Sequence, residues 1–584
     1  MFLPATREEM KSLGWDRLDV ILVSGDAYID SPFIGVAVIG NLLVRAGYRT
    51  GILAQPEVRD GSDISRLGEP RLFWGITAGA IDSMVANYTA LRKKRRQDDM
   101  TPGGENSRRP DRAAIAYANL VRKYFKNTRP LVLGGVEASL RRVAHYDYWS
   151  DSVRRSLLAD AKADFLVYGM GERAVLELAG RLDRGEDPRG IRGICFLDRD
   201  PPADYLPLPS YEEVCGDKSK FTEMFRLFYD NQDAITARGL VQKQDSRFLV
   251  HNPPSAPLSE AEMDDAHGLP FERQAHPFCR GRGEVRTLAT IRHSLISHRG
   301  CYGECRFCSI AVHQGRTVSS RSSASLVREA ESFLGDPDFK GVIQDVGGPS
   351  ANMYAIECRR KLEKGACRRK HCLYPSPCRH LPVRHGPQRE LLRRLRSTPG
   401  IRKVFVASGI RYDMVLSDTA EGRAYLEDLV RHHVSGQLKV APEHSSRPVL
   451  EAMGKPGWSV LQEFRKTFDD LNRSAGKKQF LTYYLIAAHP GCDEAAMEDL
   501  RRAVTRDLRM NPEQVQVFTP TPSTFSALMY YTGKDPFTGE ELYVERDLRK
   551  KEKQKMCLFR GGRERQAGKT GKHCLSPRKK QERK

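Results

Sequence analysis

The chain has 584 residues, 40% of them hydrophobic and 29% charged, with a net charge of +21 and 13 cysteines. A chain this long predicts about three domains of a globular, soluble protein. It contains no uninterrupted apolar stretch of about 18 residues and no basic and then apolar leader, so we expect neither a membrane span nor secretion. In the cytoplasmic setting that remains, cysteines bind metals more often than they form disulfides.

The first 200 residues alternate strand-like and helix-like segments. Short apolar runs predict strands, and the amphipathic runs between them predict helices. The expected strands are 18–23, 48–53, 72–76, 130–133 and 163–168. One expected helix ends at Ala46, and another spans 173–182. This alternation is typical of a doubly wound, flavodoxin-like parallel sheet, whose ligands bind beyond the carboxyl ends of the strands.

Two further segments lack such a pattern. Residues 201–285 are punctuated by prolines and only 220–229 is helix-like, so we expect an irregular connection that lies over both neighbouring domains. Residues 538–584 form a basic carboxyl-terminal extension, in which 15 Lys and Arg stand against three Asp and Glu from Arg549 onward. Because it has little apolar content, this tail is predicted to be mostly disordered, and RNA is the partner that its charge would suit.

Three cysteines crowd into eight residues after a strand-like run. Cys301, Cys305 and Cys308 follow the apolar segment 291–296. Thiolates this close together need a shared metal, because their charges repel one another. A closed zinc site and a cubane iron–sulfur cluster both take four protein ligands, so three cysteines leave one iron open to a substrate or cofactor. A zinc site with a distant fourth ligand and ordinary core cysteines are the alternatives.

Residues 286–537 repeat the order strand, then helix. The expected helices are 322–334, 422–432, 459–471 and 493–507, and the expected strands are 341–344, 404–407, 438–441, 480–486 and 515–518. This repeat predicts a parallel barrel, whose site lies at the carboxyl ends of its strands. The residues that follow these strands and could bind there are Gly347, Gly348, Ser408, Arg411, Glu443, His444 and His489.

The spacing of the three cysteines, with Phe307 just before the last one, resembles the signature of the radical S-adenosylmethionine (SAM) superfamily. The resemblance implies a partial six-unit (βα) barrel and a 4Fe–4S cluster on Cys301, Cys305 and Cys308, whose open iron binds SAM. It further implies that an electron from a donor such as flavodoxin or ferredoxin splits SAM into methionine and a 5′-deoxyadenosyl radical. The sequence does not identify the substrate of that radical.

The same resemblance implies roles for the residues at the barrel mouth. Gly347 and Gly348 would contact the methionine amino group, although Pro349 replaces the acidic residue of the superfamily motif. Ser408 and Arg411 would meet the ribose and the carboxylate of SAM, and Glu443 closes a later strand beside them.

The amino-terminal half resembles the cobalamin-binding domain that precedes many radical SAM cores. The resemblance lies in the Gly134-Gly135 turn and in the turn at 169–172. The Asp-x-His-x-x-Gly element of that domain would fall at 30–35, but Pro32 stands at the histidine position and cannot ligate cobalt. We therefore expect a sheet that has kept this shape and lost the cofactor, and a cobalamin without a protein ligand is the alternative.

The order of all these pieces is similar to the YgiQ-like radical SAM proteins, a family whose substrates are largely unassigned. Besides the cysteine loop, the segments that carry the resemblance are 24–30, 439–444 and 517–522. Two other functions stay open. One is a cobalamin-assisted methyltransferase or methylthiotransferase acting on RNA or protein, and the other is a non-catalytic protein that binds metal and RNA.

A second cysteine group is inserted between two barrel strands. Its segment is rich in Arg, Lys and Pro and cannot bury a core of its own, and its members are Cys358, Cys367, Cys372 and Cys378. Four thiolates would complete a zinc site or a fully ligated iron–sulfur cluster. We therefore expect an auxiliary metal beside the SAM pocket, and a surface loop with incidental thiols is the alternative.

Overall fold

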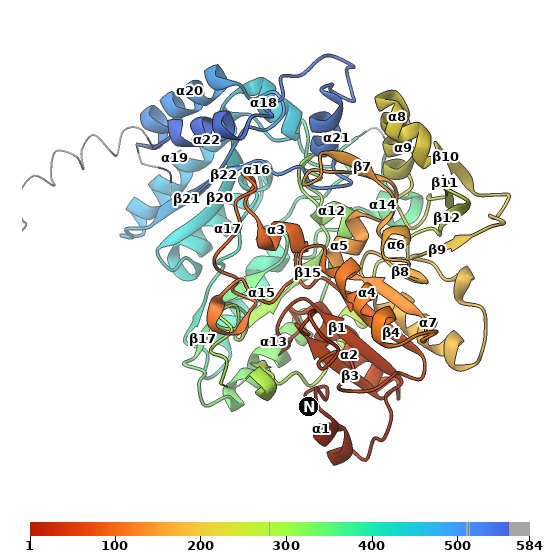
Figure 1. Ribbon diagram of the computed structural model, residues 1–584. Coiled ribbons are helices and arrows are strands. Elements are labelled where there is room, and N and C mark those ends of the chain that lie inside the picture. The colour runs from red at the N-terminus through yellow and green to blue at the C-terminus, as the bar shows by residue number, and fades with distance from the viewer. Residues whose placement is uncertain (280, 369, 510–511, 513, 560–584) are drawn as a thin grey trace, which may run out of the picture.

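The structure is a computed structural model that describes residues 1–279, 281–368, 370–509, 512 and 514–559. It has two α/β bodies, an amino-terminal sheet and a second body of short parallel strands ringed by helices (Figure 1). Within these ranges, no helix is both long enough and apolar enough to cross a membrane.

The amino-terminal body is a nine-stranded sheet in the order β10-β11-β12-β9-β8-β5-β4-β1-β3. Its strands are β1 (Val20–Ser24), β3 (Thr50–Ala54), β4 (Phe73–Thr77), β5 (Leu131–Gly134), β8 (Phe165–Val167), β9 (Ile194–Asp198), β10 (Leu206–Leu208), β11 (Leu240–Gln244) and β12 (Arg247–His251). The five strands from β8 to β3 are parallel, whereas β9 and β12 run antiparallel to their neighbours. The predicted parallel α/β sheet is confirmed.

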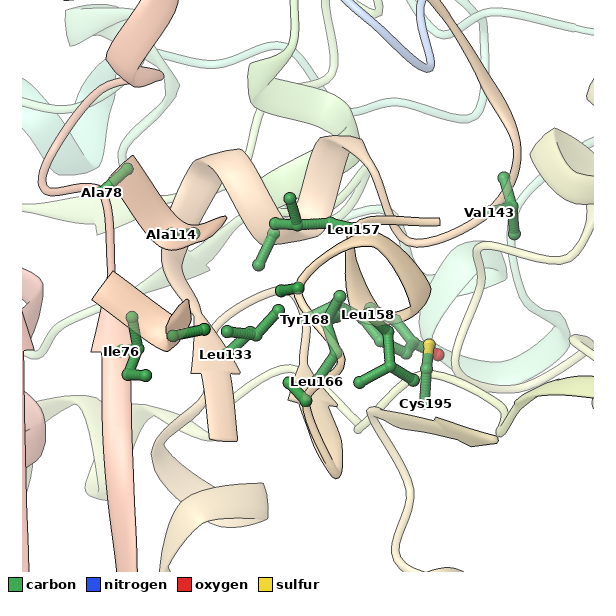
Figure 2. Packing of buried hydrophobic residues seen from close by; sticks show 14 of the residues in the cluster. Ile76, Ala78, Ala114, Leu133, Val143, Leu157, Leu158, Leu166, Tyr168 and Cys195 are labelled. Atoms are coloured by element: carbon green, nitrogen blue, oxygen red, sulfur yellow. The ribbon is translucent and has the colours of Figure 1, made fainter. Parts of the chain in front are cut away.

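Helices bury this sheet on both faces. One face carries a row of cross-strand neighbours, namely Leu53, Val23, Ile76, Leu133, Leu166 and Cys195. Figure 2 labels four of them and shows Leu158 of α6 (Leu157–Asp160) beside Leu166 and Cys195. The opposite face packs against α2 (Gly35–Arg45) and α7 (Glu172–Asp183). Strands covered on both faces are apolar throughout, which is why short apolar runs predicted them.

The segment between the bodies is not irregular, so that prediction is wrong. Besides β10, β11 and β12, it forms α8 (Tyr211–Gly216), α9 (Lys218–Asp230) and α10 (Glu260–His267). The three strands extend the first sheet, where His251 of β12 pairs with Cys195 of β9. Pro207 lies inside β10, the last strand of the sheet, and an edge strand tolerates a residue without a backbone N–H. The prolines that argued for a loop are therefore compatible with a strand.

The second body is a partial barrel. Its strands are β14 (Ser294–Ile296), β17 (Val342–Ile343), β18 (Asp345–Gly347), β19 (Lys403–Val404), β20 (Gln437–Glu443), β21 (Phe480–Ala487) and β22 (Gln514–Val517). Every pairing among them is parallel. The surrounding helices are α13 (Ser323–Ser332), α15 (Gly386–Ser397), α17 (Gly422–Asp428), α19 (Trp458–Ser474) and α20 (Glu494–Ala503). The predicted partial (βα) barrel is confirmed.

The carboxyl-terminal segment joins the two bodies. Helix α21 (Phe525–Thr532) packs into the core of the first sheet, and α22 (Leu548–Cys557) packs on α20 and β22 of the barrel. Lys551 of α22 is fully buried and donates to the hydroxyls of Tyr148 and Tyr530, at 3.2 and 2.9 Å. The prediction of a disordered tail from Arg549 onward is therefore wrong as far as Phe559, and the rest of that tail, 560–584, lies outside the described residues.

Candidate functional site

The cysteine loop is closed by a short hairpin at the mouth of the barrel. The loop runs from β15 (His298–Arg299) to β16 (Ser319–Ser320), which pair antiparallel. Gly300 has a φ of 82°, and a Cβ at this position would lie 2.0 Å from the carbonyl oxygen of Thr317, so only glycine fits. A Cβ at Gly303 would lie 3.2 Å from Sγ of Cys301 and 3.6 Å from Sγ of Cys305. Both sulfurs therefore flank one point in the loop.

The three thiols affect one another electrostatically. Burial and the neighbouring Cys305 raise the pKa of Cys301 to about 11 and that of Cys308 to about 12. Among the residues that the structure describes, no three His, Cys, Asp or Glu side chains converge on a single ion. The cysteines of a cubane each bind a different iron, so three neighbouring thiols suit three irons of one cluster.

Arg411 brings a positive charge to this loop. Its Nη1 donates to Sγ of Cys305 at 3.4 Å, while its Nε and Nη2 donate to the carboxylate of Asp413 at 2.8 and 2.5 Å. Asn352 fixes the backbone, because its Oδ1 accepts from the Arg411 N–H at 2.7 Å. Burial alone would lower the pKa of Arg411, but Asp413 more than offsets it and the pKa is raised. The guanidinium is thus a fixed cation beside the thiol of Cys305.

Glu443, at the end of β20, lies near Cys308 of the same loop. Its φ is 68°, and the register of the β20–β21 pair shifts between Val440 and Glu443. Such strained backbone is concentrated at functional sites. Burial raises the pKa of Glu443, and Lys455, whose Nζ lies 3.7 Å from Oε1, opposes this rise. Glu443 also contributes to the raised pKa of Cys308.

Gly347, Gly348 and Ser408 form a neighbouring cluster at the ends of β18 and β19. A Cβ at Gly347 would lie 2.6 Å from Oγ of Ser408, and a Cβ at Gly348 would lie 2.4 Å from the ring of His298. Oγ of Ser408 donates to Asp345, which also accepts from the Ser408 N–H at 3.1 Å. Sequence reasoning missed Asp345 and His298, although Asp345 stands only two residues before the glycine pair.

His444 and His489, also expected at the barrel mouth, are buried there as neutral rings. Burial lowers the pKa of His444 to about 4 and that of His489 to about 3. Nε2 of His489 lies 2.7 Å from Oγ of Ser526, and Nε2 of His444 lies 3.5 Å from Sγ of Cys492. Their contacts are those of structural side chains.

The second cysteine group packs directly behind the loop. Cys358 and Cys372 are buried in an apolar cluster together with Tyr302, and Cys378 lies at its border. Over the described part of this insertion, no three His, Cys, Asp or Glu side chains are placed so that they could hold one metal ion. The auxiliary metal therefore stays a prediction.

A buried carboxylate connects the loop to the insertion. Glu304 lies between two cysteines of the loop, and its Oε2 and Oε1 lie 3.0 Å from Nε of Arg316 and 3.1 Å from Nζ of Lys361. Burial alone would raise the pKa of Glu304, but Arg316 and Lys361 outweigh it and hold this pKa below its ordinary value. Sequence reasoning treated Glu304 as a spacer residue and missed this network.

Comparisons with known proteins agree with this architecture. A family model described as Radical SAM N-terminal matches residues 2–294, and a domain of unknown function (DUF3362) matches 513–581. A UPF0313 protein of Fusobacterium nucleatum is 55% identical over 555 residues, which cover 95% of this chain and 98% of that protein. A UPF0313 protein of Thermotoga maritima is 48% identical over 569 residues, covering 97% and 100%.

Two solved structures are similar at a lower level. The radical SAM methyltransferase TsrM from Kitasatospora setae, with cobalamin and a [4Fe-4S] cluster bound, has a TM-score of 0.49 and 15% identity, and the match covers 87% of this chain and 74% of that one. The cobalamin-dependent enzyme OxsB, with aqua-cobalamin and SAM bound, has a TM-score of 0.49 and 10% identity, covering 95% and 62%. Likeness at this level assigns no cofactor, and it does not bear out the expectation that cobalamin has been lost.

The match over residues 2–294 and the 55% identity along nearly the whole chain confirm the predicted radical SAM membership, and this chain belongs to the UPF0313 family.

Proposed function

We propose that this protein is an enzyme that holds a 4Fe–4S cluster on Cys301, Cys305 and Cys308 and cleaves SAM reductively to act on a second substrate. The observation that carries the proposal is the group of three neighbouring thiols at the barrel mouth, with the guanidinium of Arg411 3.4 Å from Sγ of Cys305. Three cysteine ligands leave one iron open for SAM. When bound, the cluster supplies the electron that splits SAM into methionine and a 5′-deoxyadenosyl radical.

The surrounding residues would bind and orient SAM. The Arg411 guanidinium would pair with the methionine carboxylate, since a fixed, buried arginine forms strong charge-assisted hydrogen bonds. The backbone carbonyls at Gly347 and Gly348 would accept from the methionine ammonium. Glu443, whose pKa is raised by burial, would meet the ribose hydroxyls. Ser408 would orient Asp345, because its hydroxyl already donates to that carboxylate.

Formation of 5′-deoxyadenosine tests this function. The full chain, reconstituted with iron and sulfide without oxygen, should convert SAM to 5′-deoxyadenosine when dithionite replaces a cellular donor such as flavodoxin or ferredoxin. Cys305→Ala should lose this activity, because no other thiol of the loop can supply the lost ligand. Cys215→Ala, at an exposed cysteine, is the matched control and should keep it. Product formation by Cys305→Ala at the wild-type rate would reject the proposal.

A further inference from the structure

A cavity lies between the two bodies, next to the cysteine loop. One wall is the turn that follows β8, which includes Tyr168, Gly169 and Met170. The opposite wall is the chain just past the loop, 311–317, which begins in α12 (Ile310–His313). Along the chain, this wall begins three residues after Cys308.

Four arginines line the cavity, and three of them are paired with a carboxylate. The pairs are Arg173 with Glu262, Arg299 with Glu172, and Arg316 with Glu304. Arg142 differs, because it forms an ion pair with no carboxylate of the described chain although its side chain is almost fully buried, at 1% exposure. A buried charge without a counter-ion costs free energy, so its presence calls for a ligand of opposite charge.

The contacts of Arg142 hold its charge in place without neutralising it. Its Nε donates to Nε2 of His251 at 3.0 Å, and its Nη1 donates to the carbonyl of Ser139. Its guanidinium carbon lies 4.5 Å from the ring centre of Tyr168, which Figure 2 labels, and 4.7 Å from that of Phe228. Burial lowers the pKa of Arg142, whereas the pKa of Arg316, which has Glu304 beside it, is raised despite burial.

Other groups at the cavity also favour an anion. Helix α7 begins beside this turn, and its N-cap residue Gly171 provides no side chain to satisfy the free N–H groups. Helix N-termini of this kind bind carboxylates and phosphates. His313 contacts Oγ of Ser139 at 2.9 Å, and burial lowers its pKa to about 4, so the ring is neutral at pH 7 and the positive charge here is that of Arg142. Asp233, the acid among the lining residues, acts electrostatically on Arg316 and not on Arg142.

We infer that this cavity binds an anionic group, a carboxylate or a phosphate, with Arg142 as its counter-ion, and that this group belongs to the second substrate. The assignment of this anion to a substrate rests on the proposed function, because it assumes that radical chemistry takes place at the neighbouring cysteine loop. Anion binding itself requires only the folded chain.

Thermal unfolding of the full chain tests the inference. Inorganic phosphate in one arm and acetate in the other should raise the wild-type Tm by a few degrees more than sodium chloride at the same ionic strength, because a ligand that binds only the folded state stabilises it. The anion with the larger effect identifies the group. Arg142→Gln, which keeps hydrogen-bond donors but loses the charge, should abolish the extra rise. Arg142→Lys, which keeps the charge, should reduce the rise without abolishing it.

A matched variant separates this effect from ordinary destabilisation. Arg321 is as deeply buried as Arg142, at 1% exposure, but pairs with Glu329. Without added anion, Arg321→Gln should melt below Arg142→Gln, because it breaks a buried ion pair and leaves Glu329 with Arg273 alone, whereas Arg142→Gln breaks no ion pair. The inference is wrong if phosphate and acetate act on wild type no more than chloride does, or if Arg142→Gln responds as wild type does.

The outcome is independent of SAM cleavage. Cleavage of SAM by a chain that shows no anion effect would reject only this inference. An anion effect in a chain that cannot cleave SAM would reject the proposed function and leave an anion site of another purpose.

Discussion

The chain carries two cysteine groups that lie against each other, and their surroundings differ. In the loop group, Gly303 lets two sulfurs flank one point, and Arg411 places a cation beside them. In the inserted group, Cys358 and Cys372 are packed into an apolar cluster, and burial raises the pKa of Cys372 to about 11. Closely spaced cysteines thus indicate a cluster only where the backbone turns them toward one another, and buried thiols otherwise act as small apolar side chains.

The largest expected effect separates the two groups by their metal content. The Cys301→Ala, Cys305→Ala and Cys308→Ala triple variant should lose the iron and acid-labile sulfide of the proposed 4Fe–4S cluster, because these cysteines are its protein ligands. Iron, zinc and acid-labile sulfide analysis of the anaerobically purified chain measures this. Residual metal that disappears when Cys367 and Cys372 are also replaced would instead establish the auxiliary site.

The next effect concerns the carboxylate that joins the groups. Glu304→Gln leaves Arg316 and Lys361 buried without their counter-ion, so the chain should lose about 3–5 kcal/mol of stability. Thermal unfolding of the metal-free chain measures the loss. Glu451→Gln, which breaks a solvent-exposed pair with Arg447, should change stability by less than about 1 kcal/mol. Equal melting temperatures of the two variants would show that the ion pairs of Glu304 do not stabilise the chain.

A smaller effect is expected at the guanidinium beside Cys305. Arg411→Gln removes the charge proposed to pair with the SAM carboxylate, so SAM binding should weaken by about 1.5–3 kcal/mol. Equilibrium dialysis with the reconstituted chain gives this affinity. Arg411→Lys should recover part of it, since it restores the charge without the two-pronged contact to Asp413. Unchanged affinity in Arg411→Gln would place the SAM carboxylate elsewhere.

The smallest effect is a dependence of stability on pH. Burial raises the pKa of Cys301 from 9.0 to about 11 and that of Cys308 to about 12, so both thiols are neutral in the metal-free chain at pH 7. Their contribution to stability is complete below pH 9 and is lost as the pH rises toward 11 and 12. Between pH 8 and 10.5, the Tm of the metal-free wild type should therefore fall more steeply than that of the triple alanine variant. Parallel curves would contradict the buried placement of these thiols.

How much of the fold could be predicted depends on how local each signal is. Strands such as β5 are covered on both faces, so their apolar runs stand out in the sequence. Strands β10 to β12 lie toward one edge of the sheet, where prolines and polar residues are tolerated and the apolar pattern weakens. Helix α22 was missed because its buried face carries Lys551 and Gln554, whose carbon chains pack as apolar groups do.

How much of the site could be predicted also depends on how local each signal is. The cysteine loop could be predicted because its three cysteines and its glycines lie within a few residues of one another. The pairing of Glu304 with Lys361 and the contact of Arg411 with Cys305 join segments far apart in the sequence, and no local pattern announces them. The cavity around Arg142 is lined by both bodies, and although the turn at 169–172 stood out in the sequence, the pattern did not show that Arg142 lies beside it.

The central claim is that SAM binds at an iron left open by Cys301, Cys305 and Cys308, and electron paramagnetic resonance of the reduced, reconstituted chain tests it most directly. The spectrum should show one 4Fe–4S cluster per chain, and its signal should change when SAM is added, because SAM would become the fourth ligand of the open iron. A cluster signal that saturating SAM leaves unchanged, or a chain that assembles no cluster, would contradict the claim.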